Sequence, residues 1–143
     1  MAEPIIEKTI ALTRSLRNVA TQVMEQAHKA RDAGELPLPD FLAVAERYQE
    51  MINEANRAIH DAAARLPSLT DDFSAIEDAT RTLEADAVLL KQVTDVLTVA
   101  AKLLVAMASL ATLIAHPDPS GVATTAAAVY DAARAIRDQA NSR

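Results

Sequence analysis

Glu25 and His28 are the two residues whose types and spacing come nearest to a known chemistry. The segment Glu25-Gln26-Ala27-His28 holds a glutamate and a histidine three positions apart, which places both side chains on one face of a helix. Di-iron bundles use this Glu-x-x-His spacing, but they need two such pairs together with further carboxylates. A second copy is absent from the sequence. A carboxylate and histidine metal site is therefore a remote alternative, and a solvent-exposed His28 is the simpler interpretation.

The other residues whose side chains could take part in catalysis or metal binding have no suitable partners nearby in the sequence. His60 has no glutamate three positions before it, and Ser109 and Ser120 have no evident general base or oxyanion-binding loop. Gly34 and Gly121 are interpreted as helix punctuation rather than as parts of a phosphate-binding loop. The chain has no cysteine, which removes disulfides and thiolate chemistry together. We therefore expect no enzymatic activity, no metal and no cofactor.

The composition indicates one domain built from packed helices. Half of the residues are hydrophobic but only 3% are aromatic, and there are 2 glycines, a balance that favours helices over strands. A chain of 143 residues is long enough to bury a core of its own. The predicted fold is therefore all-α, with a single domain over residues 1–143. The net charge of −6 argues against nucleic acid as a partner, because the basic residues are interleaved with acidic ones.

Prolines and glycines divide the chain into four long helices of a predicted up-down bundle. Pro4 fits the first turn of a helix, and Gly34 fits the position just after a helix end. Prolines at positions 37, 39, 67, 117 and 119 mark the connections, because each proline disfavours helix in the residue before it. The predicted helices cover residues 3–33, 39–66, 70–115 and 119–141.

The predicted third helix contains the feature that most needs explanation. Residues 70–115 include no glycine or proline, so an unbroken helix would be ~70 Å long. It would overhang the two helices before it, which are roughly 40 Å each. A break near residues 84–87 would instead give five helices. The second half of the segment, Val96 to Ala115, is almost entirely apolar, and Lys102 is its one charged residue.

Three arrangements would cover this apolar segment. It could be the central helix of a closed bundle formed by one chain. It could be completed by another chain, because the helix over 119–141 presents mostly small side chains and would cover only part of the overhang. It could also insert into a membrane, since about 20 apolar residues are long enough to span one. In that case, the hairpin around 96–115 would be hidden in a soluble form and released on a bilayer.

The expected function is binding through a protein–protein interface, with self-association through residues 96–140. Small, acidic, cysteine-free helical bundles serve as adaptors, as chaperones of secreted partners and as neutralising partners of basic toxins. The sequence has no recognisable secretory signal, which favours a cytoplasmic location. Its alanine and arginine content is typical of a GC-rich bacterial genome. The predicted interface residues are Val96, Val99, Leu103, Val105, Met107, Leu110, Leu113, Ile114, Val122, Val129 and Ile136.

Overall fold

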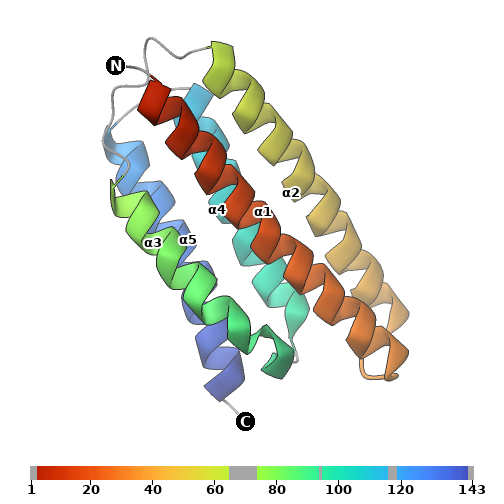
Figure 1. The fold of residues 1–143 in the computed structure, drawn as a ribbon. Helices are drawn as coiled ribbons and strands as arrows, with labels where there is room; N and C mark the ends of the chain where they lie inside the picture. Colours follow the sequence, from red (N-terminus) through yellow and green to blue (C-terminus); the bar gives the residue numbers. More distant parts are fainter. Residues whose placement is uncertain (1–2, 65–73, 94, 116–118, 142–143) are drawn as a thin grey trace.

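The chain folds into a bundle of five α-helices, shown in Figure 1. The computed structural model describes residues 3–64, 74–93, 95–115 and 119–141. The elements are α1 (Glu3–Asp32), α2 (Leu38–Ala64), α3 (Ser74–Asp86), the 3-10 helix η2 (Ala87–Gln92), α4 (Val96–Ala115) and α5 (Pro119–Asn141). Successive α-helices run in alternating directions (Figure 1), and the described ranges contain no strand. The predicted all-α up-down bundle is confirmed in its five-helix form.

The end of α1 is closed by a glycine, as the sequence predicts. Gly34 has a φ of 75°, a left-handed conformation that glycine adopts without a steric penalty. Its N–H donates to the carbonyl of Arg31 at 3.0 Å, and the N–H of Glu35 donates to the carbonyl of Ala30 at 2.8 Å. These two bonds satisfy carbonyl groups that the last turn leaves without helical partners. The chain can therefore reverse direction and start α2 within a few residues.

The predicted third helix is broken into two, and the break begins within the predicted residues 84–87. Helix α3 ends at Asp86, η2 follows, and Val93 is extended with a φ of −84° and a ψ of 129°. Asp95 then caps α4, since its carboxylate accepts the N–H of Thr98 at 3.1 Å and the Thr98 hydroxyl at 2.6 Å. The predicted start of this helix at residue 70 lies outside the described residues, as do residues 65 and 66 of the second helix.

Helix α4 lies at the centre of the bundle and packs against α1, α2 and α5. Helix α3 packs against α5 and, less closely, against α1. An ion pair of 3.2 Å between Arg137 and Asp86 joins α5 to the end of α3. The unbroken, overhanging third helix of the four-helix alternative is therefore not formed. Because α4 is folded back between three neighbours, one chain supplies partners for most of its wide apolar arc.

Gly121 does not terminate a helix, and its interpretation as punctuation is wrong. It lies within α5, and a Cβ atom added to it would be 2.9 Å from Cδ1 of Leu113 in α4. Since real Cβ atoms do not approach other carbons this closely, a side chain at position 121 would require Leu113 to move. The glycine therefore permits a close approach between α4 and α5.

Candidate interaction surface on helix α4

The structure places most of the predicted interface residues in the core of the single chain. Nine of the eleven are buried, with exposed fractions of 2% or less: Val96, Val99, Leu103, Met107, Leu110, Leu113, Ile114, Val129 and Ile136. Val122 is half-buried and packs against the same core. Val105 is 56% exposed. In an isolated chain, Val105 is thus the one predicted residue whose side chain lies largely on the surface.

Val105 lies at the middle of a face of α4 that the described helices leave exposed or half-buried. The residues three, four and seven positions away share this face, and all of them are exposed or half-buried. We define the outer face of α4 as Thr98, Ala101, Lys102, Val105, Ala108, Ser109 and Thr112. Its only charge is Lys102, for which no ion pair occurs among the described residues. The outer face is therefore weakly polar and carries a single charge.

Two half-buried leucines extend the apolar character of this face towards α2. Leu97 and Leu104 are partly buried and pack against the core at the edge of the outer face. Helix α4 is long and apolar enough to cross a membrane, by length and composition alone. Half of its residues are buried inside the chain. Such a helix is also what the centre of a water-soluble bundle requires. This role accounts for the buried half of α4 but not for the apolar residues on its exposed half.

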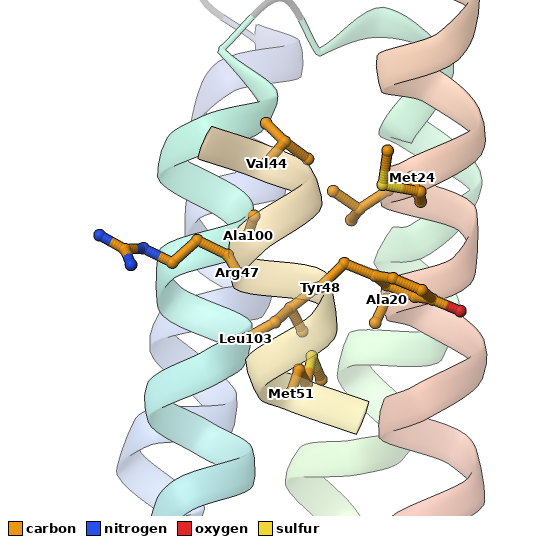
Figure 2. A pocket seen from close by; sticks show the side chains of 9 residues that line it. Ala20, Met24, Val44, Arg47, Tyr48, Met51, Ala100 and Leu103 are labelled. Atoms are coloured by element: carbon orange, nitrogen blue, oxygen red, sulfur yellow. The ribbon is translucent and has the colours of Figure 1, made fainter. Parts of the chain in front are cut away.

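Arg47 marks the border between α2 and the outer face. Figure 2 shows its side chain leaving α2 with the guanidinium group directed away from a hollow inside the bundle, and Arg47 lines this hollow together with Ala100 and Leu103 of α4. The guanidinium lies 3.6 Å from the carboxylate of Glu50, and both side chains are more than 40% exposed. An exposed pair of this kind contributes about 0–1 kcal/mol to stability. Arg47 therefore brings a charge beside an otherwise apolar helix without being held there by a strong interaction.

This hollow inside the bundle is too small to bind a substrate. It lies between α1, α2 and α4, is seen in Figure 2, and has a volume of about 10 Å³. Ligand pockets are typically about 300–1,000 Å³, whereas this hollow has room for about one water molecule. Its lining residues are Ala20, Val23, Met24, Val44, Arg47, Tyr48, Met51, Ala100 and Leu103. It is therefore a small packing defect rather than a binding pocket.

Glu25 and His28 do not belong to a cluster of metal ligands. Both are exposed on α1, and the His28 ring packs edge-on against Phe41 with ring centroids 5.0 Å apart. In the part of the chain that the structure describes, no group of three or more His, Cys, Asp or Glu side chains could hold a metal ion. The described geometry gives the Glu-x-x-His spacing no further support.

Other large apolar side chains on the surface lie apart from the outer face. Leu38 and Leu42 are exposed on the first turns of α2, and Val88 is exposed in η2. Leu38 and Leu42 share one face of α2, because they are four residues apart, and Val88 stands alone. Each is a shorter exposed stretch than the run of apolar and uncharged positions along α4.

The outer face could have been found from the sequence by a different use of the same pattern. Thr98, Lys102, Ser109 and Thr112 are the polar positions within the apolar segment. Val105 is spaced three, four or seven residues from each of them, so it shares their face. Val105 is among the predicted interface residues, but most of the residues predicted with it lie in the core. Position on the helix, rather than hydrophobicity, decides which side of α4 it occupies.

Comparison with known proteins adds no functional information. No family model matches the chain, and no match was found among the curated proteins or the solved structures.

Proposed function

We propose that this protein acts by binding another polypeptide through the outer face of α4. The observation that carries the proposal is the exposure of Val105 on a helix whose outer face holds a single charge, Lys102. The other helices carry several charges each on their exposed sides. Burial of an exposed valine and its neighbours contributes roughly 25 cal/mol for each Å² removed from water. Contact with a second polypeptide is the simplest way to gain this energy in water.

The proposed class is a non-enzymatic binding protein, such as an adaptor, a chaperone or a neutralising partner. The hollow inside the bundle has a volume of about 10 Å³, and three open surface hollows have volumes of about 160, 180 and 260 Å³. All are smaller than the usual ligand pocket of about 300–1,000 Å³, which favours an interface over a pocket. Such a protein needs a stable scaffold and one exposed binding face, and the proposal assigns these roles to the buried side of the bundle and to the outer face of α4.

Site-specific crosslinking tests the proposal directly. In the cells that naturally make the protein, a photoreactive amino acid replaces Val105. A control variant carries the same amino acid in place of Ala85, an exposed alanine on α3. We expect light-dependent polypeptide adducts from position 105 and few from position 85. Equal yields of adducts at both positions, or none at either, would contradict an interface on α4.

Membrane insertion by the hairpin around residues 96–115 is a second candidate function. It is favoured by the length and apolar composition of α4, which meet the requirement for a spanning helix. Insertion would expose side chains that now pack against α1, α2 and α5, so the bundle would have to open. Release of a trapped dye from anionic lipid vesicles tests this function. If the protein acts only by binding another polypeptide, the native chain should release no more dye than a Val105→Lys variant does.

A further inference from the structure

The segment that joins α3 to α4 has an unusual local structure for its residue types. The 3-10 helix η2 is 6 residues long, whereas runs longer than about 3–4 residues are uncommon because their hydrogen bonds are poorly aligned. Its sequence is AVLLKQ, in which alanine, leucine, lysine and glutamine all favour the α-helix. Neither glycine nor proline imposes the break. A stretch of 3-10 helix within a helical sequence often marks a hinge.

The apolar pattern on the two sides of η2 is in phase with one continuous helix. Leucine or isoleucine recurs at intervals of seven residues from α3 through η2 into α4, at Ile76, Leu83, Leu90, Leu97 and Leu104. Residues seven positions apart lie on the same face of an α-helix. An unbroken helix over these three elements would therefore keep one apolar face. The local sequence suits both the broken and the unbroken form, and packing against the rest of the bundle selects between them.

The break divides the bundle into two parts that cover each other's apolar faces. Helices α1, α2 and α3 form one part, and the hairpin of α4 and α5 forms the other (Figure 1). Helix α4 packs against α2 and α1, and α5 packs against α3. The ion pair of 3.2 Å between Asp86 and Arg137 also joins the two parts. Because these contacts lie between the parts, the hairpin of a second chain can supply them as well as the hairpin of the same chain.

We propose that η2 is a hinge through which two copies of this chain exchange their α4–α5 hairpins. In the exchanged dimer, η2 and Val93 become α-helical, and one helix runs from α3 through α4 in each chain. The hairpin of each chain completes the bundle of the other, so Asp86 of one copy pairs with Arg137 of the other. Since both forms make the same contacts between the parts, the balance depends on the hinge and on protein concentration. The outer face of α4 stays exposed in both forms.

A mixture of two charge-reversed variants distinguishes exchange from any other association. Asp86→Arg alone brings two guanidinium groups together in each bundle, and Arg137→Asp alone brings two carboxylates together. In an exchanged dimer of one chain of each variant, one bundle contains both native residues and the other contains both substituted ones. Opposite charges are thus restored in both bundles. The variants are mixed in urea, refolded together at high concentration and compared with each variant refolded alone, so a variant that folds poorly alone still gives a readout.

Asp78 and Arg81 provide the matched control, because their ion pair has the same length of 3.2 Å but lies within α3. Both residues belong to one part of the bundle, so exchange leaves each of them beside the residue of its own chain. Size-exclusion chromatography with light scattering measures the dimer yield. We expect roughly tenfold more dimer from the mixture of Asp86→Arg and Arg137→Asp than from either variant alone. The mixture of Asp78→Arg and Arg81→Asp should show no such gain.

The N-cap of α4 provides a second, independent measurement. The carboxylate of Asp95 caps a helix start that the unbroken helix does not have. Asp95→Ala therefore weakens the closed monomer and not the exchanged dimer. Because two caps are lost for each dimer formed, the association constant should rise roughly thirtyfold. Asp78→Ala removes a carboxylate whose surroundings are the same in both forms, so it should leave the constant at its native value.

Three results would overturn the exchange. The first is that the native chain and Asp95→Ala both stay monomeric after refolding at every concentration. The second is that the mixture of Asp86→Arg and Arg137→Asp gains no more dimer than the control mixture. The third is a dimer that Val105→Asp abolishes, because such a dimer forms through the outer face and not through the hinge. Crosslinking at position 105 tests the proposed function separately, since exchange leaves that position exposed.

Discussion

Cδ1 of Leu113 lies 2.9 Å from the position that a Cβ atom on Gly121 would occupy. The tip of the Leu113 side chain in α4 can occupy the space beside residue 121, near the start of α5, because residue 121 has no side chain.

Gly121→Val is therefore expected to destabilise the fold by about 1–3 kcal/mol, the usual cost of overpacking a core. The control is Ala123→Val, which introduces the same side chain at an exposed position of α5. It should change the free energy of unfolding by less than about 1 kcal/mol. Urea unfolding followed by circular dichroism measures both. Equal effects of the two variants would mean that the 2.9 Å approach does not limit the packing.

The two sides of α4 are expected to respond differently to a charge. Leu103→Asp and Leu110→Asp each bury an unpaired carboxylate and should cost more than about 3 kcal/mol. Val105→Asp should cost less than about 1 kcal/mol in dilute solution, because its side chain is 56% exposed. Thermal unfolding at low protein concentration compares the three. A Leu103→Asp or Leu110→Asp chain with native stability would show that the burial of α4 is assigned to the wrong face.

The division into helices follows from the sequence wherever proline or glycine interrupts it. Helix α1 ends just before Gly34 and helix α5 starts at Pro119, at or beside the predicted positions. The break between α3 and α4 is different, because neither residue occurs there. Asp95 and Thr98 cap α4 instead, a local signal that is weaker than the long run of helix-forming residues around it. Tertiary packing decides between the two, since a folded-back α4 buries far more apolar surface than an overhanging one.

Asp95→Ala should destabilise the fold by about 1 kcal/mol, the usual cost of losing a helix N-cap. The change removes both hydrogen bonds to Thr98 and leaves one N–H of the first turn without its partner. Asp78→Ala on the exposed side of α3 is the control and should have a smaller effect. If both substitutions lower the melting temperature equally, the cap does not stabilise the start of α4.

A buried hydroxyl on α5 provides a prediction of the opposite sign. Thr125 is fully buried, and its hydroxyl has no hydrogen-bond partner among the described residues. Thr125→Val keeps the shape and removes the unsatisfied group, so it should raise the stability by about 1 kcal/mol. Thr80 is also buried, but its hydroxyl donates to the carbonyl of Ile76 at 2.7 Å, so Thr80→Val should not stabilise. Differential scanning calorimetry compares the melting temperatures of the two variants. An equal rise in both would mean that the missing hydrogen bond of Thr125 does not explain the gain in stability.

The residues of the proposed interface were harder to predict than the fold. The apolar spacing along residues 96–115 correctly identifies what must be buried, but spacing alone does not say whether the covering helices come from the same chain. Leu103, Met107 and Leu110 are covered by the chain itself, because the break at residues 87–95 turns α4 back into the bundle. Val105 is left outside, because it lies on the opposite side of the same helix.

The most direct test of the central claim is the reactivity of a single thiol on the outer face. The chain has no cysteine, so Val105→Cys and Ala85→Cys each introduce one thiol, on α4 and on α3. Alkylation rates are measured in dilute purified protein, in concentrated protein and in an extract of the producing cells. The proposed interface predicts that the two thiols react at similar rates when dilute, and that only the thiol at position 105 becomes protected at high concentration or in the extract. A thiol at position 105 that reacts as fast as the one at position 85 under all three conditions would contradict an interface on α4.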